Sequence, residues 1–177
     1  MLNNAQLTHL IAFLLLLARL GDVGSTYLIT PTLKLEANPI ARRLRWPFAA
    51  VTVLAAAVPY YSLPMGITFL VVSLLVCASN CSRIWFIRTI GEDEYHRLVI
   101  DTARRTPLGL GVASCLLSPL CMATIGGVTF LFYPSLDKDW GAWIAYGFIL
   151  YAVAMGFFGF STFLRYRKEG MALLMTS

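Results

Sequence analysis

The sequence predicts an all-α, polytopic integral membrane protein, built as a bundle of five transmembrane helices. Hydrophobic residues make up 58% of the 177 residues and charged residues only 13%, whereas a soluble domain is about half apolar and about a quarter charged. The apolar residues gather in stretches of the length that crosses a bilayer as a helix, about 17–25 residues. These stretches are continuous rather than alternating, which excludes a membrane β-barrel.

The predicted spans are separated by short segments that are polar or contain proline. They are Leu7–Ile29, Pro47–Leu63, Met65–Ile87, Leu108–Tyr133 and Ala142–Leu164. The second is the least regular, because Pro59 and Pro64 shorten the part that can be a regular helix. Between the third and fourth spans, residues 91–106 open with acidic and close with basic side chains. This order suits a helix dipole and predicts a short helix at the cytoplasmic interface.

Three regions follow from this pattern. Residues 1–90 form a three-helix module with the polar motif described below, 91–107 form the interfacial helix, and 108–177 form a two-helix extension with a basic cytoplasmic tail. The extension is expected to serve packing, because small residues at four-residue spacing allow helices to approach closely. These pairs are Ala123 with Gly127 and Ala152 with Gly156. Its phenylalanines are expected to face lipid or the core.

Basic residues predict that the N-terminus lies outside and the C-terminus inside. In this orientation the cytoplasmic segments carry twelve Lys and Arg residues and the outer segments only Lys138, as the positive-inside rule requires. The twelve are Lys34, Arg42, Arg43, Arg45, Arg83, Arg88, Arg97, Arg104, Arg105, Arg165, Arg167 and Lys168. The net charge of +5 therefore indicates attraction to anionic lipid on the cytoplasmic side, not nucleic-acid binding. We expect a multi-pass protein of the plasma membrane, the inner membrane of a bacterium.

Asp22 is the only carboxylate within the predicted spans. A charge at bilayer depth is costly, so it is expected to face the bundle interior or a water-filled cavity and to have a partner. Arg19, three residues before it, and Thr26, four after it, share its helical face. Asp22 is therefore either a binding residue or one half of a structural ion pair with Arg19.

The segment after the first span offers further polar groups on a backbone that is not helical. Pro31 ends the helix, and Glu36 and Asn38 supply oxygen atoms close to that end. Asp22 lies roughly 10 Å before it, at 1.5 Å per residue. If the loop folds back, these groups line one polar pocket at the cytoplasmic side, which residues of similar depth in the third span complete. The candidate ligand-binding residues are Arg19, Asp22, Thr26, Glu36, Asn38, Asn80 and Arg83.

The motif resembles a known family. An Asp22-x-x-Ser25-Thr26 start, a Glu36-Ala37-Asn38-Pro39 loop and Asn80 late in the third span are similar to the DUF5658 family of small prokaryotic membrane proteins of unknown function. The resemblance covers about residues 7–90, and Ser25 stands where the family usually has Thr. It implies that Asp22, Thr26, Glu36, Asn38 and Asn80 act as one unit, without naming their chemistry.

Three functions stay open at this point. The first is a pocket that binds or moves a small polar solute, an ion or a lipid headgroup. The second is a non-catalytic accessory or assembly subunit of a membrane complex, with the polar residues serving only folding. The third, a membrane enzyme acting on a lipid, is disfavoured because the sequence has no H-E-x-x-H, nucleophile elbow or phosphate-binding glycine loop. Expected partners are membrane lipids, a second copy or a larger membrane complex.

A metal is a further hypothesis. An oxygen-only set of Asp22, Glu36 and Asn38 suits Mg²⁺ or Ca²⁺ better than zinc, and such an ion could hold a lipid phosphate.

Overall fold

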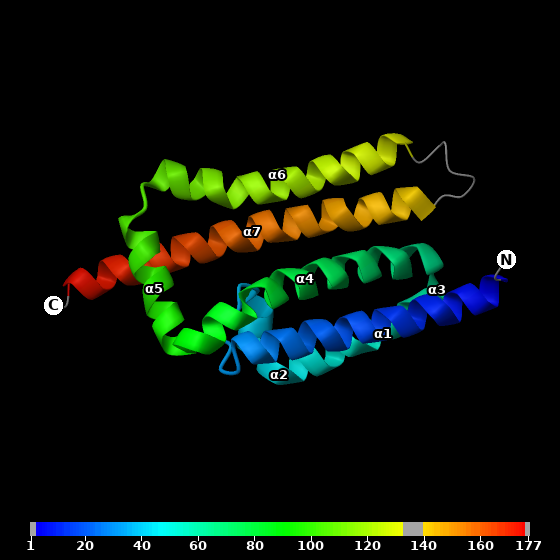
Figure 1. Ribbon diagram of the computed structural model, residues 1–177, viewed down its shortest axis with the longest axis horizontal. Coiled ribbons are helices and arrows are strands. Elements are labelled where there is room, and N and C mark those ends of the chain that lie inside the picture. Colours follow the sequence, from blue (N-terminus) through cyan, green and yellow to red (C-terminus); the bar gives the residue numbers. More distant parts are fainter. Residues whose placement is uncertain (1–2, 133–139, 176–177) are drawn as a thin grey trace.

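The structure, a computed structural model, describes residues 3–132 and 140–175 and is helical throughout its regular elements. Four helices are long and apolar enough to cross a membrane (Figure 1). They are α1 (Asn4–Ile29), α4 (Leu63–Ile90), α6 (Leu108–Phe132) and α7 (Trp140–Met175). The all-α class and the multi-pass character are thus confirmed. Tyr133 and Lys138, named in the sequence predictions, lie outside the described residues.

The second predicted span does not form one continuous helix, so a fifth spanning helix is not confirmed. Its residues are divided among α2 (Pro39–Val53), a 3₁₀ turn η1 (Leu54–Ala57) and α3 (Val58–Tyr61). Within α2, Arg45 has φ 57° and ψ −150°, which breaks the helix. Pro47 and Pro59 add to the break, because each lacks a backbone N–H and cannot continue the ladder of the preceding turn.

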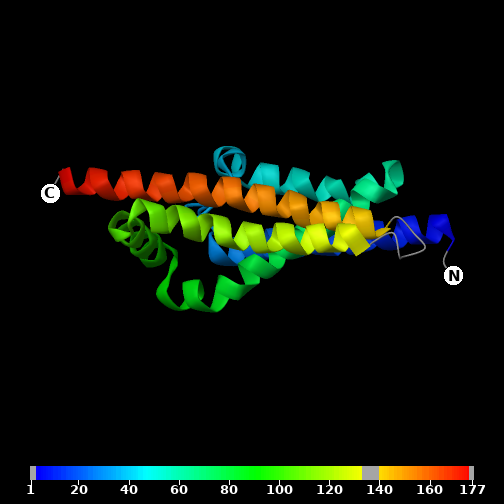
Figure 2. The ribbon, with the colours of Figure 1, turned by 90° about the horizontal axis from the view of Figure 1, so that it is seen from above.

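The long helices run along one axis of the molecule in both views, and α5 (Glu92–Arg105) turns across it at one end (Figures 1 and 2). Helices α1 and α4 pack side by side in the same direction, and the broken segment from α2 to α3 returns along α1. Helices α6 and α7 form an antiparallel pair that joins the rest through contacts of α7 with α4 and α5. As a result, α1 begins at one end of the bundle and α7 finishes at the other.

Side-chain caps explain where the first helices begin. The Asn3 side chain accepts a hydrogen bond from the Gln6 amide, and the Gln6 side chain accepts one from the Asn3 amide, which forms a capping box for α1. Ser62 caps α4 by accepting from the Met65 amide. Such caps satisfy amides that the first turn of a helix leaves without partners.

Close packing uses only some of the small residues expected to provide it. A Cβ atom on Gly147 of α7 would lie 2.6 Å from Val71 Cβ of α4, so this glycine permits a tight crossing. Gly126 is similarly close to Ile149. Gly127, in contrast, has no heavy atom within 4 Å of such a Cβ, and Gly156 makes only ordinary contacts. Gly127 therefore does not make the close contact predicted for the Ala123–Gly127 pair, whereas the residue before it, Gly126, makes one.

Candidate functional site

An ion pair within α1 is one polar element of the site. Arg19 Nη1 lies 2.8 Å from Asp22 Oδ2, and Asp22 is only 9% exposed. The same guanidinium atom lies 3.5 Å from Ser73 Oγ of α4. The partner expected for Asp22 is therefore Arg19, one turn away on the same helix face. Asp22 Oδ1 makes no hydrogen bond to any described residue, so this carboxylate keeps one free acceptor.

Asn80 joins α4 to α1 immediately beside this pair. Its Nδ2 atom donates to Thr26 Oγ1 at 3.0 Å and to Ser25 Oγ at 3.3 Å. Ser25 Oγ in turn donates to the Asp22 carbonyl at 3.0 Å. Hydrogen bonds of this kind between membrane helices are worth about 0.6 kcal/mol on average. Asn80 thus fixes the alignment of two helices and still presents its amide oxygen.

The Glu36-Ala-Asn-Pro segment is the start of α2. Asn38 Oδ1 accepts from the Ile40 amide at 2.9 Å, and Pro39 occupies the first helical position, where its missing N–H costs nothing. Glu36 Oε1 accepts from the Asn38 amide at 2.8 Å. The asparagine is therefore committed to capping, a role that the sequence interpretation named only in general terms.

Glu36 is half-buried within this loop. Burial raises the pKa of its carboxyl above the ordinary value of 4.5, and hydrogen bonds from backbone amides and the nearby Arg165 guanidinium lower it only in part. Arg165 itself has side-chain nitrogen atoms that are buried without a hydrogen-bond partner. The positive charge of Arg165 on α7 therefore acts on the carboxyl group of Glu36 in the loop.

Glu92, at the start of α5, holds the preceding part of the loop in place. Its carboxylate accepts from Thr30 Oγ1 at 2.5 Å, from Thr32 Oγ1 at 2.8 Å and from the Lys34 amide at 3.3 Å. Lys34 Nζ pairs with Asp93 at 2.5 Å. Acidic residues are favourable at a helix N-terminus, so this contact serves α5 and the loop together.

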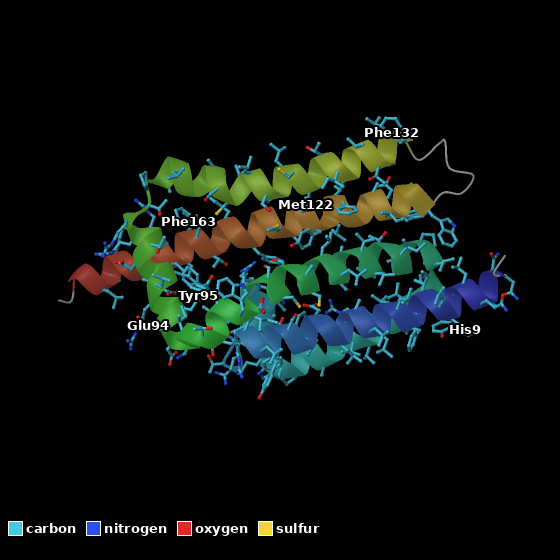
Figure 3. The ribbon with its side chains drawn as sticks, in the orientation of Figure 1. His9, Glu94, Tyr95, Met122, Phe132 and Phe163 are labelled. Atoms are coloured by element: carbon cyan, nitrogen blue, oxygen red, sulfur yellow. The ribbon has the colours of Figure 1, made fainter. Side chains whose placement is uncertain are left out.

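All seven candidate residues line a single cavity of about 630 Å³. The cavity lies between α1, α2, α4, α5 and α7, and the loop after α1 forms part of its wall. Figure 3 shows two further lining residues, Tyr95 of α5 and Phe163 of α7, at the same end of the bundle. The expected juxtaposition of Asp22, Glu36 and Asn80 is thus present, while their role in binding stays a prediction.

The sequence interpretation missed the contribution of α7, which it regarded as a packing element. The cavity residues of this helix are Tyr151, Ala154, Met155, Phe158, Gly159, Thr162, Phe163 and Tyr166. Their spacing of three to four residues places them on one helix face. Thr162 Oγ1 is buried and has no hydrogen-bond partner. The only signal in the sequence was the recurrence of Tyr and Thr on one face of an apolar helix. Tyr95, Arg45 and Trp46 were also missed as cavity residues.

The donor set does not fit Mg²⁺ or Ca²⁺ well. Asp22 is already paired with the Arg19 cation, and Asn38 Oδ1 is used in capping. Within the described ranges, no group of three or more His, Cys, Asp or Glu side chains is placed to hold a metal ion. Divalent cations take six or more oxygen ligands, which these residues do not assemble.

Comparisons of the chain with protein-family models, with curated proteins and with solved structures give no match.

Proposed function

We propose that this chain is a membrane protein whose cavity binds, or moves across the membrane, a small ligand that carries a polar group. The observation that carries the proposal is that residues from α1, the following loop and α4 line one cavity of about 630 Å³. A volume of this size, with few polar groups among apolar walls, is typical of small-molecule sites. Strain supports it too: the non-glycine residues with positive φ, Leu33 and Arg45, both line the cavity, and backbone strain concentrates at functional sites.

We further propose that the chain crosses the membrane five times, N-out and C-in, with the cavity near the cytoplasmic face. The opposite positions of the start of α1 and the end of α7 support an odd number of crossings (Figure 1). The broken segment of residues 39–61 would be the second crossing. Irregular backbone is tolerated at membrane depth only where protein or a cavity surrounds it, and Arg45, Trp46 and Phe48 of this segment line the cavity. Interrupted helices also build the binding sites of many transporters.

The proposed location is the plasma membrane, the inner membrane if the source is bacterial. The excess of basic residues on the segments assigned to the inside supports this orientation. Membership of the DUF5658 family is likewise our proposal. It is supported by the compact cap that Glu36, Asn38 and Pro39 form beside the cavity.

Native mass spectrometry tests the binding function. The wild type is compared with Asp22→Asn and with the milder Thr26→Val, all purified gently enough to retain ligands. We expect a discrete adduct on the wild type that both variants carry at a lower fraction, because both residues line the cavity. Equal adduct-free spectra from three equally folded proteins would contradict the proposal.

A non-catalytic accessory subunit is the second candidate, and one observation favours it. Arg19 and Asp22 neutralise each other within one helix, and Asn80 bonds to Ser25 and Thr26, so these groups can serve folding alone. Both carboxylates of the cavity already hold partners, which disfavours acid–base catalysis more strongly. A stoichiometric partner protein that co-purifies with wild type and with Asp22→Asn alike would favour this candidate.

A further inference from the structure

Positively charged residues outnumber negatively charged residues in the lining of the cavity. They are Arg19, Asp22, Glu36, Arg45 and Arg83, three cations and two anions. Arg19 is neutralised by Asp22 at 2.8 Å, and Glu36 accepts a hydrogen bond from the Asn38 amide at 2.8 Å.

Arg45 and Arg83 are the uncompensated cations. Arg83 Nη2 donates to the neutral Ser79 Oγ at 2.9 Å, and neither arginine forms an ion pair with any of the described residues. Arg45 reaches the cavity from a strained backbone position with φ 57°, a conformation that costs about 1–3 kcal/mol in a non-glycine residue. Both side chains are exposed, and two arginines that line one cavity are suited to an anion with several oxygen atoms, above all a phosphate.

Apolar side chains make up most of the remaining lining of the cavity. Val72 and Val76 of α4 and Ala154, Met155 and Phe158 of α7 are part of this apolar lining. Figure 3 shows the side chains of these two neighbouring helices along the middle of the bundle. A cavity of about 630 Å³ is also much larger than a phosphate ion needs. The ligand is therefore expected to have an apolar portion beside its anionic group.

An organic cation is the main alternative, because aromatic side chains and carboxylates also line the cavity. Such a ligand would need an unpaired carboxylate, or an aromatic face without a competing cation. Asp22 is paired with Arg19, and Glu36 accepts a hydrogen bond from the Asn38 amide, whereas Arg45 and Arg83 have no acidic partner among the described residues. The charge balance thus favours an anion.

Resting on the proposed binding function, we propose that the ligand is an anionic amphiphile with a phosphate group. Arg45 and Arg83 bind the phosphate, and the wall made by α4 and α7 receives the acyl or alkyl chain. A phospholipid of the surrounding bilayer and a free phosphate share the anionic chemistry, and only the first uses the apolar wall.

Equilibrium binding to the purified full-length chain in a non-ionic detergent tests this assignment. The probes are dihexanoyl phosphatidic acid, dihexanoyl phosphatidylcholine, inorganic phosphate and dodecyltrimethylammonium. We expect phosphatidic acid to bind with a Kd at least about tenfold lower than the Kd of each other probe, as the loss of one charge-assisted hydrogen bond implies. Tighter binding of the ammonium probe overturns the proposal. If inorganic phosphate binds with the same Kd as phosphatidic acid, the ligand is not an amphiphile, and the site is assigned to the free phosphate ion.

Matched variants test the residues. Arg45→Gln and Arg83→Gln are each expected to raise the Kd of phosphatidic acid about tenfold. Arg43→Gln and Arg88→Gln, exposed neighbours on the same helices that do not line the cavity, are expected to keep the wild-type Kd. If all four substitutions raise the Kd equally, Arg45 and Arg83 attract anions only in a general way, and the assignment is overturned.

The outcome also separates this inference from the proposed function. If no probe binds but an Asp22-dependent adduct is present in native spectra, the phosphate assignment fails and the binding function stands. If no probe binds and no Asp22-dependent adduct is present, the phosphate assignment and the proposed binding function both fail.

Discussion

Burying the charges of Arg19 and Asp22 costs free energy, and the electrostatic attraction between the two side chains offsets this cost. Removing charges from water costs several kcal/mol per ion, which a close pair offsets only when both members are present. The distance of 2.8 Å between Nη1 and Oδ2 and the small exposure of Asp22 place the pair in this regime. Each residue therefore stabilises the fold mainly by neutralising the other.

A double-mutant cycle on this pair tests that interpretation. Arg19→Gln and Asp22→Asn are each expected to lower the free energy of unfolding by about 3 kcal/mol, because each leaves one buried charge alone. The double variant is expected to lose less than the sum. Unfolding in detergent micelles by denaturant measures all four proteins. Strictly additive losses would show that the pair is not coupled.

Glu36 predicts a dependence of stability on pH. Because burial raises the pKa of its carboxyl in the folded chain above the ordinary 4.5, the folded state binds the proton more tightly than the unfolded state. The contribution of Glu36 is therefore fully present below pH 4.5 and is lost as the pH rises through the raised pKa.

Glu36→Gln is the matched change, because its amide oxygen still accepts from the Asn38 amide. Melting temperatures measured across this pH window are expected to fall for the wild type relative to the variant as the pH rises. Parallel curves for the two proteins would contradict the effect of burial.

At the level of single residues, hydropathy was enough to find Asp22, because a carboxylate in a long apolar run is costly wherever it points. The capping of α2 by Asn38 needed only the Asn-Pro order. The cavity residues Tyr151 and Thr162 could not be found, because their role depends on which face of α7 meets α4 and α5. No pattern within one helix fixes that choice.

Among the elements, the loop after α1 owes its position to α5. Glu92 accepts four hydrogen bonds from this loop at 2.5–3.3 Å, and the loop carries Glu36 to the cavity. The contact joins residues about sixty positions apart in the sequence, so the sequence pattern did not reveal it. We infer that α5 positions the site although it contributes few of its polar groups.

Glu92→Ala is expected to release this loop. The backbone amides of Thr32 and Lys34 lose their acceptor, so their hydrogen exchange is expected to become faster, while amides in the middle of α1 keep their protection. Glu94→Ala is the control, since Glu94 pairs only with its exposed neighbour Arg97 at 3.6 Å. Unchanged exchange in Glu92→Ala would show that the loop holds its shape without α5.

Helix boundaries were well predicted where apolar residues ran without interruption. The span expected at Met65–Ile87 is α4, Leu63–Ile90, and the short helix expected within residues 91–106 is α5. The prediction failed at Pro47–Leu63, where composition indicated a span but prolines and the conformation of Arg45 divide the helix. Hydropathy measures how apolar a segment is, and it is insensitive to a backbone break.

For the whole molecule, the number of crossings decides which side the cavity faces. If the broken segment crosses, the turn at Tyr61 lies outside and Lys34 lies inside. With the native cysteines replaced by Ser, a single Tyr61→Cys is expected to react with an impermeant maleimide in intact cells. Lys34→Cys is expected to react only after permeabilisation. Tyr61 and Lys34 are both exposed positions. Labelling of both from the same side would show that residues 39–61 return without crossing.

If the cavity holds a ligand, a side chain that fills the cavity must displace that ligand. Gly159 lines the cavity, and a Cβ placed on it meets no heavy atom within 4 Å. Gly159→Leu is therefore expected to occupy the space of the ligand without disturbing the packing of α7. Gly127→Leu is the control, because Gly127 has the same free space but does not line the cavity.

The measurement is the fraction of ligand-bound protein in native mass spectra of the wild type and these two variants. We expect an adduct on the wild type and on Gly127→Leu that is lost from Gly159→Leu, with all three proteins unfolding at similar temperatures. An adduct retained in full by a folded Gly159→Leu would contradict this expectation, because the ligand would then bind elsewhere.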